Sequence, residues 1–258
     1  GTPYFTMDLK SGSNLARLIE QNKEVNNLAQ QLEIFLKVCD AISYSHSNNV
    51  IHLDLKPDNI QVGEFGEVLV CDWGLAKILN TPDKTIDHET LLNPDLLNNI
   101  TLAGQISGTP GFMSPEQVKS EDKNIQSDIY ALGCILYNIL TGEAPFSGSL
   151  EQILKNTTSS GICPPRVKYP NKHISESLNA IVEKAVKIDP KMRYQSVSDL
   201  KNDIKKYLDG YSPLAENASY LKELQLFYGR NKTFCLTLLS SISVLIIMTV
   251  LFVSNLNT

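Results

Sequence analysis

Residues 50–60 read VIHLDLKPDNI, a polar loop between two apolar segments. Before this loop, apolar residues recur at three- and four-residue steps over residues 25–42, which is typical of a half-buried helix, and we expect the helix to end near His46. After the loop, two β-branched runs within residues 60–70 flank a Gly-Glu-Phe-Gly turn, which predicts a hairpin. The sequence therefore predicts that a long helix and a hairpin hold this loop between them.

Further motifs follow the loop in a fixed order. The turn Asp72-Trp73-Gly74 comes after the hairpin, and residues 107–116 contain Ser-Gly-Thr-Pro and Ser-Pro-Glu. Residues 127–133, Ser-Asp-Ile-Tyr-Ala-Leu-Gly, lie in a very apolar helix, and Arg193 stands shortly after an Asp-Pro pair. The loop resembles the catalytic loop of protein kinases, H-R-D-L-x-x-x-N, and the later motifs resemble the family's D-F-G, A-P-E, central helix and late arginine.

This resemblance covers residues 3–208 and implies a fold class. We expect an α+β fold, the protein-kinase-like C-terminal lobe, which is mainly α-helical with a small β-hairpin. Serines that can accept an amide hydrogen bond open three further predicted helices, at residues 149–155, 175–187 and 196–208. The expected domains are the end of an N-lobe strand and hinge (1–12), the kinase C-lobe (13–209), a juxtamembrane segment (210–232) and a transmembrane helix (233–254).

The predicted transmembrane helix rests on residues 234–253, FCLTLLSSISVLIIMTVLFV, which contain no charged residue. About 20 residues suffice to cross a hydrocarbon core of roughly 30 Å. Arg230 and Lys232 precede this segment, so the positive-inside rule places the lobe in the cytoplasm. A buried core helix is the alternative. We expect a single-pass protein of the cell (inner) membrane.

The resemblance assigns chemistry to four side chains. Asp54 would accept the hydrogen bond of the substrate hydroxyl, and Lys56, the usual residue of Ser/Thr kinases at this place, would stabilise the γ-phosphate. Thr109 would bond Asp54 and shape the acceptor site. Asn59 would help to bind the nucleotide's metal. The implied activity is a Ser/Thr protein kinase that transfers the ATP γ-phosphate to protein hydroxyls.

ATP and Mg²⁺ are the implied cofactors. Asn59 offers an amide oxygen and Asp72 a carboxylate, which are the oxygen ligands that Mg²⁺ prefers. Met7 would be the gatekeeper of the adenine pocket, and backbone groups of Asp8 and Leu9 would meet the adenine edge. An ordinary edge strand is the alternative for this last segment, because a hinge has no strict motif.

Other residues of the motifs receive structural interpretations. We expect His52 to be a buried structural histidine that packs beside the metal-binding loop, and Trp73, next to the metal-binding aspartate, to be core packing. Glu116 and Arg193 should form a buried ion pair, and Asp128 should accept backbone amides of the catalytic loop.

Composition restricts the partners. The net charge of −5 argues against a protein whose main task is to neutralise nucleic-acid phosphates. Five scattered cysteines without CxxC spacing indicate neither a zinc site nor a disulfide framework. The expected partners are therefore protein substrates, ATP and a membrane, and no nucleic acid.

Three departures from the kinase pattern bear on activity. The glycine-rich loop, strand lysine and helix glutamate of the family should precede residue 1, so this chain alone should have little activity, and its start favours a fragment. Leu53 replaces the arginine that in many kinases clasps an activation-loop phosphate. Residues 79–101 form an insertion of unassigned role. The motifs most resemble bacterial receptor-type Ser/Thr kinases; the alternative is a membrane-tethered pseudokinase scaffold.

Overall fold

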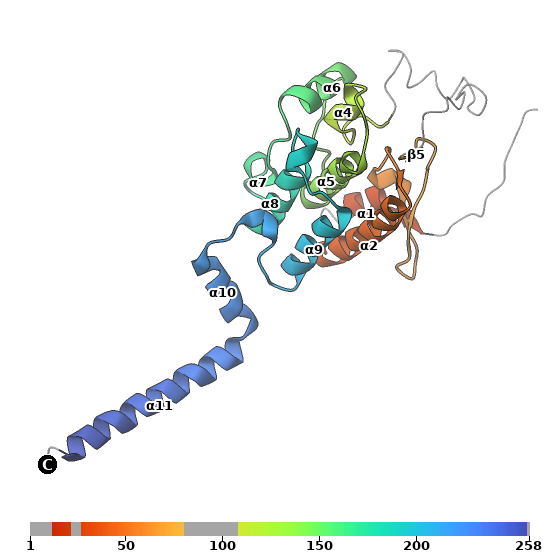
Figure 1. Ribbon diagram of the computed structural model, residues 1–258. Helices are drawn as coiled ribbons and strands as arrows, with labels where there is room; N and C mark the ends of the chain where they lie inside the picture. The colour runs from red at the N-terminus through yellow and green to blue at the C-terminus, as the bar shows by residue number, and fades with distance from the viewer. Residues whose placement is uncertain (1–11, 22–26, 80–107, 257–258) are drawn as a thin grey trace, which may run out of the picture.

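The computed structural model describes residues 12–21, 27–79 and 108–256, whose helices form one lobe from which the C-terminal helix projects (Figure 1). The N-terminal half contains β1 (Ser13–Asn14), α1 (Leu15–Gln21), α2 (Leu28–Ser47), β2 (Val50–Ile51), the 3₁₀ turn η1 (Pro57–Asn59), β3 (Ile60–Val62), β4 (Val68–Val70) and β5 (Lys77–Ile78). The C-terminal half contains α4 (Pro115–Val118), α5 (Ile125–Thr141), α6 (Leu150–Ser159), α7 (Pro165–Lys168), α8 (Glu176–Ala185), η3 (Pro190–Met192), α9 (Val197–Leu208), η4 (Leu214–Glu216), α10 (Tyr220–Arg230) and α11 (Lys232–Leu256).

The core of the lobe is built around α5. Nearly every residue of this helix is buried, and it packs against α2 and α8. A Cβ atom at Gly133 would lie 2.6 Å from Val186 Cγ1 and 2.8 Å from Ala185 Cβ, so the absence of a side chain lets the two helices approach closely. The predicted central helix is confirmed, and Gly142 ends it in the left-handed conformation (φ 72°).

Two small sheets lie beside α2. Strands β3 and β4 form the predicted antiparallel hairpin with Ile60 opposite Val70, and β1 pairs with β3 on its other side. The second sheet pairs β2 with β5, with Ile51 opposite Lys77. These pairings fix both ends of the loop between β2 and β3.

Side-chain caps explain where several helices begin. Ser149, Ser175 and Ser196 each accept a hydrogen bond from a backbone amide in the first turn of α6, α8 and α9. Asn14 does the same for α1, accepting from the amide of Arg17 at 2.9 Å. The three helices expected from these serines are therefore confirmed, α6 being longer than predicted.

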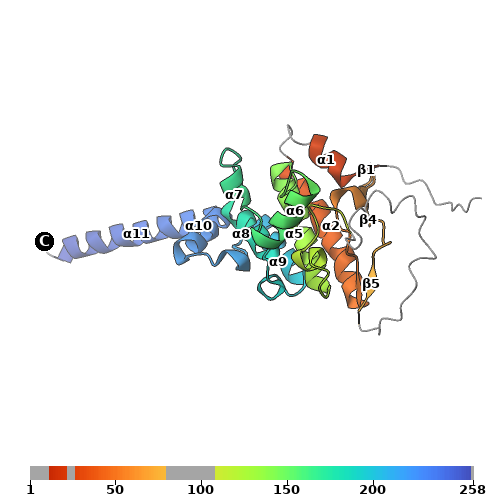
Figure 2. The same cartoon turned by 90° about the horizontal axis from the view of Figure 1, so that it is seen from above.

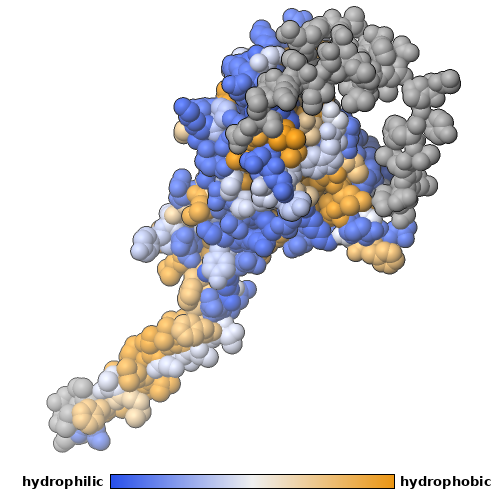
Figure 3. All heavy atoms as spheres, turned by 45° about the vertical axis from the view of Figure 1, so that its right-hand side comes forward, coloured by the Kyte–Doolittle hydropathy of each residue, from blue (hydrophilic) through white to orange (hydrophobic). Residues whose placement is uncertain are grey.

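The two C-terminal helices lie outside the core. Figures 1 and 2 show α11 extending away from the lobe, on the side opposite to the strands and to the loop between β2 and β3. A span-length apolar segment, Lys232–Phe252, makes up most of α11, and none of it is buried. Its surface is mainly hydrophobic, whereas the lobe shows a largely hydrophilic one (Figure 3).

Candidate active site

The loop between β2 and β3 is fastened to the core helix. Asp128, 1% exposed on α5, accepts the backbone amides of His52 (2.9 Å to Oδ2) and Leu53 (2.9 Å to Oδ1). His46 Nε2, at the end of α2, lies 2.7 Å from the same Asp128 Oδ2. The role predicted for Asp128 is confirmed, and it fixes two consecutive backbone amides of the loop to the core helix.

Leu53 adopts a strained backbone conformation with φ 66°. A left-handed conformation costs roughly 1–2 kcal/mol for a residue with a side chain. Asp128 holds its amide, and Gln117 Nε2 donates to its carbonyl at 2.7 Å, so both polar groups of this residue are fixed. These two bonds explain how the strained turn persists immediately before Asp54.

The carboxylate of Asp54 is the meeting point of the site. Its Oδ1 accepts from Thr109 Oγ1 (2.8 Å) and from the Thr109 amide (3.0 Å), while Asn59 Nδ2 donates to its Oδ2 (3.2 Å). Lys56 Nζ lies 3.2 Å from the same Oδ2 and donates to Thr109 Oγ1 at 2.6 Å. The structure thus brings four of the predicted site residues together around one nearly buried carboxylate.

Asp72 follows the strand β4, and the residue before it is bonded to this loop. The amide of Cys71 donates to the carbonyl of Asn59 at 2.8 Å, which places Asp72 one residue beyond a bond to the loop. His52 also connects the two segments, because its Nε2 donates to the Cys71 carbonyl (3.0 Å) while its Nδ1 accepts from the Asp54 amide (3.2 Å). The predicted buried position of His52 is confirmed.

Asn59 and Asp72 both retain oxygen atoms that could face a cation. Asn59 uses its amide N–H groups on the carbonyl and the carboxylate of Asp54, and within the described ranges its Oδ1 accepts no hydrogen bond. Asp72 has an exposed carboxylate and a left-handed backbone (φ 62°). In the parts of the chain that the structure covers, no group of three His, Cys, Asp or Glu side chains could hold a metal by itself. One amide and one carboxylate still suit Mg²⁺, since this ion commonly takes only one or two protein ligands beside phosphates and water.

Trp73 differs from its expected place in the core. Its ring centroid lies 4.5 Å from that of His52, and its Nε1 donates to the Val70 carbonyl at 2.9 Å. The side chain nevertheless remains 38% exposed. Its packing therefore covers one face of the loop histidine instead of filling the interior.

A buried ion pair lies at the C-terminal end of the segment that carries Thr109. Arg193 donates to both carboxylate oxygens of Glu116, at 2.7 and 2.8 Å, and Ser127 donates to Glu116 Oε1 at 2.7 Å. Burial by itself raises the pKa of Glu116, but these donors outweigh it and hold the pKa below its ordinary value. The predicted buried pair is confirmed, with both side chains nearly inaccessible (0% and 4% exposed).

Two residues that support the loop were not predicted from the sequence. Gln117 stands next to Glu116 in the sequence, and its amide group connects Ser114 to the carbonyl of Leu53. His46 marks the end of α2, and nothing in its local pattern points to Asp128, which is remote in the sequence. The predicted adenine residues Met7, Asp8 and Leu9, and residues 80–101 of the insertion, lie outside the described residues.

Known proteins are similar in sequence to most of this chain. A model of the protein kinase domain matches residues 2–204. The serine/threonine-protein kinase PknD of Protochlamydia amoebophila is 37% identical over 227 residues, which cover 82% of the chain and 23% of that protein. Proteins of the same name from Chlamydia felis and Chlamydia trachomatis are 35% and 34% identical over 223 residues, with 80% of the chain covered in each case. The chain spans 23–24% of the length of these three relatives.

Proposed function

The chain belongs to the protein kinase family, and from this premise we propose that the full-length protein is a membrane-anchored kinase that transfers the γ-phosphate of ATP to Ser and Thr hydroxyls of proteins. The convergence of Lys56, Asn59 and Thr109 on the carboxylate of Asp54 carries the proposal. The names of the bacterial relatives support the Ser/Thr class.

Asp54 orients the acceptor hydroxyl in this proposal. Both of its carboxylate oxygens accept hydrogen bonds, from Thr109 on one side and from Lys56 and Asn59 on the other. The side chain of Lys56 is 20% exposed, so its ammonium group can move from Asp54 to a phosphate oxygen. That movement frees a carboxylate oxygen for the acceptor, while Thr109 and Asn59 keep the carboxylate in place.

Asn59 and Asp72 provide the protein ligands of Mg²⁺ in this scheme. Bound with ATP, the ion neutralises charge on the phosphate oxygens. Asn59 is held by its bonds to Asp54, and this orients the amide oxygen away from that carboxylate. The two ligands come from segments joined by the bond between Cys71 and Asn59, so β4 sets their spacing.

The adenine pocket belongs to the proposal as well. Met7 as gatekeeper and the backbone of Asp8 and Leu9 as adenine contacts follow from the resemblance to the kinase hinge. The expected boundaries, with the hinge in residues 1–12 and the lobe in residues 13–209, follow from the same resemblance.

The membrane anchor is α11. Its apolar segment of 21 residues would be about 31 Å long, at a rise of 1.5 Å per residue, which matches the hydrocarbon core. A core helix of a soluble protein would be buried, whereas none of this segment is. Arg230 and Lys232 at its N-terminal end place the lobe in the cytoplasm, and the cell (inner) membrane is the proposed location.

Substitution of Asp54 tests the catalytic proposal. In the full-length protein, Asp54→Asn should lower the rate of autophosphorylation by roughly 10²–10⁴-fold, the range for loss of a positioned acid–base group. Asp58→Asn is the matched control, because Asp58 is an exposed aspartate of the same loop. Transfer of radiolabelled phosphate is the measurement, and near-normal transfer by Asp54→Asn would remove the basis of the assignment.

A pseudokinase scaffold is the second candidate, and Leu53 is the observation that favours it. A leucine cannot clasp a phosphorylated activation segment, so regulation by that route is lost. A full-length protein that binds Mg-ATP without any phosphate transfer would be such a scaffold. Transfer that depends on Asp54 would exclude it.

A further inference from the structure

Helix α10 contacts the lobe through its charged face. Lys222 Nζ lies 3.2 Å from Glu176 Oε2 and also pairs with Glu216. Arg230 donates to the Gly210 carbonyl at 2.5 Å, and its guanidinium carbon lies 3.7 Å from the ring centroid of Tyr211. These contacts fasten both ends of α10 to the lobe.

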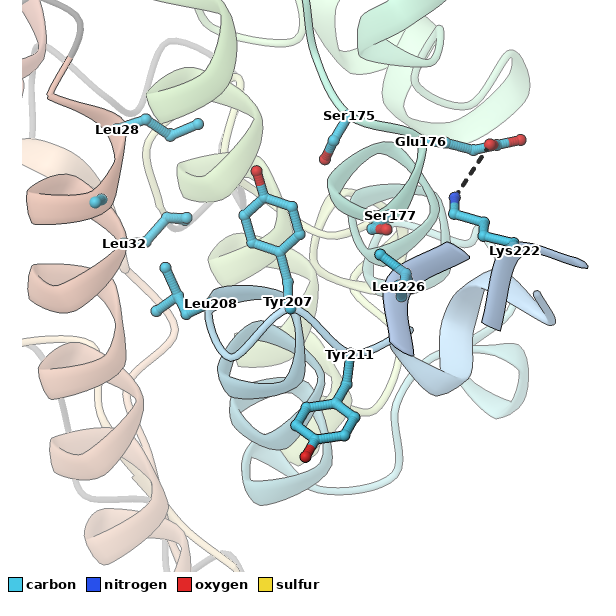
Figure 4. A pocket seen from close by; sticks show the side chains of 12 residues that line it. Leu28, Leu32, Ser175, Glu176, Ser177, Tyr207, Leu208, Tyr211, Lys222 and Leu226 are labelled. Carbon is cyan, nitrogen blue, oxygen red and sulfur yellow. Dashed lines mark hydrogen bonds and ion pairs between the residues drawn. The ribbon is translucent and has the colours of Figure 1, made fainter. Parts of the chain in front are cut away.

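A cavity of about 550 Å³ separates the middle of α10 from the lobe. Figure 4 shows Leu226 and Lys222 of α10 on one side of it and residues of α2 and α9 on the other. Leu226 is the apolar residue of α10 that lines this cavity. The helix therefore meets the lobe mainly through polar contacts at its ends.

The opposite face of α10 is apolar and points outward. At 100° per residue, five residues fall within one sector about 120° wide. They are Tyr220, Leu221, Leu224, Phe227 and Tyr228, with exposed fractions of 97%, 80%, 65%, 42% and 48%. We name this set the outer face of α10. The usual arrangement of a surface helix, with the apolar side inward, is thus reversed, and a reversed helix has its apolar side available to another apolar medium.

The position of α10 in the chain identifies that medium. Arg230 is its last residue and Lys232 is the first of α11, so Asn231 alone separates the helices. Asn231 has a non-helical backbone (φ −120°, ψ 39°), and the chain changes direction there (Figure 1). A bilayer crossed by α11 would consequently begin within about 8 Å of the end of α10, since successive Cα atoms are 3.8 Å apart.

Composition favours the bilayer surface over a second copy of the chain. The outer face combines aromatic residues with leucines, which is typical of helices that lie at the boundary between headgroups and acyl chains. Lys232, the first residue of α11, places a cation at the end that adjoins the span, where anionic headgroups attract positive charge.

We propose that the outer face of α10 lies in the interface of the cytoplasmic leaflet, so that its inner contacts hold the kinase lobe against the bilayer. This inference rests on the proposed function, because it requires α11 to span the membrane. It goes further by giving the lobe an orientation. The strands and the catalytic loop lie at the end of the lobe remote from α11, so the site would open toward the cytoplasm and away from the lipid (Figures 1 and 2).

Tryptophan reporters test the inference in the full-length protein. Leu224→Trp places an indole on the outer face, and Tyr44→Trp is the control, because Tyr44 is an exposed aromatic residue (75%) of α2. Both variants are reconstituted into vesicles of phosphatidylcholine and phosphatidylglycerol, with or without bromine near the glycerol end of the acyl chains. The emission added over the parent protein is then compared between the two kinds of vesicle.

We expect brominated lipid to remove most of the emission added by Leu224→Trp and little of that added by Tyr44→Trp. Leu221→Trp, on the same face, should behave like Leu224→Trp and serves as the second reporter. Equal, weak quenching of all three would overturn the inference. Cross-linking of two copies through residue 224 without quenching would also overturn it, since a second copy would then cover the outer face.

Extraction with alkaline carbonate separates this failure from failure of the anchor. Protein that resists extraction but lacks quenching at 221 and 224 keeps the anchor and loses the interfacial helix. Protein that carbonate releases from the vesicles would overturn both.

Discussion

Thr109 shows how much of the site depends on single hydroxyl contacts. Thr109→Val keeps the shape of the side chain but removes the 2.8 Å bond to Asp54 and the acceptor of Lys56. Hydrogen bonds to charged groups contribute about 1.5–3 kcal/mol, so we expect kcat to fall on the order of tenfold to a hundredfold.

Thr109→Ser is the matched variant, because it retains the hydroxyl and should retain most of kcat. Steady-state phosphorylation of a protein substrate by the full-length enzyme gives both values. Equal rates for the valine and serine variants would mean that the hydroxyl plays no part in positioning Asp54.

Arg193 stabilises the segment that carries Thr109 through its buried ion pair with Glu116. Arg193→Met leaves the Glu116 carboxylate buried without its cation, and loss of one partner of a buried pair costs roughly 3–5 kcal/mol. Hydrogen exchange of the α5 amides measures the free energy of opening the lobe. Lys119→Met is the control, because the Lys119–Glu121 pair is exposed (44% and 60%) and should contribute about 0–1 kcal/mol.

The same pair predicts a dependence on pH. The pKa of Glu116 is lower in the folded protein than its ordinary value of about 4.3, so its ion pair stabilises the lobe above that pH. Stability is lost as the pH falls through the lowered pKa, because the unfolded chain binds the proton more readily. In Arg193→Met the cation that lowers this pKa is gone while burial still raises it, so this acid-dependent loss should disappear, and exchange rates corrected for intrinsic chemistry report the change.

Local sequence predicted most residues of the site but not all of their contacts. Asp54, Lys56 and Asn59 share one loop, so a motif of adjacent residues was enough to predict them together. Gln117 and His46 hold that loop through single contacts to Leu53 and Asp128. Such contacts leave no periodic pattern, which is why only the tertiary structure reveals them.

Among the helices, the close approach of α5 and α8 depends on Gly133. Gly133→Ala would place a Cβ atom 2.6 Å from Val186 Cγ1, and overpacking of this kind costs typically about 1–3 kcal/mol. Gly229→Ala in α10 is the control, since nothing lies within 4 Å of its Cβ position and alanine favours a helix by about 1 kcal/mol.

Hydrogen exchange of the α5 amides should therefore show easier opening in Gly133→Ala and no weakening in Gly229→Ala. If Gly133→Ala left the exchange of α5 unchanged, the two helices would have room to move apart, and their packing would be looser than the structure indicates.

Helix prediction succeeded where polar caps and apolar stripes coincide. Serines or asparagine open α5, α6, α8 and α9, and the apolar periodicity continues behind them. Helix α10 also begins at a serine, Ser219, but its apolar stripe faces away from the lobe, and we expected only a connector there. A pattern of apolar residues shows that a helix has two faces, yet it does not say which face the protein covers.

At the scale of the whole molecule, α11 is predicted to determine whether the protein associates with the membrane. Deletion of residues 234–253 should move the full-length protein from the carbonate-resistant membrane fraction to the soluble fraction, because the apolar surface that requires lipid is removed. Fractionation and immunoblotting measure the distribution. Replacement of the same residues by an unrelated span of equal length is the control and should restore membrane association; a deletion variant that stays in the membrane would place the anchor elsewhere.

The sequence by itself determined the family, the order of the motifs, the hairpin, the capped helices and the candidate span, because each is encoded by neighbouring residues whose spacing matches a turn, a strand or a helix. The tertiary structure alone decided that Gln117 holds the carbonyl of Leu53, that His46 meets Asp128, and that α10 directs its apolar face outward. These contacts join residues far apart in the chain, and packing of the whole lobe selects them, whereas local spacing carries no record of which distant partner a side chain will find.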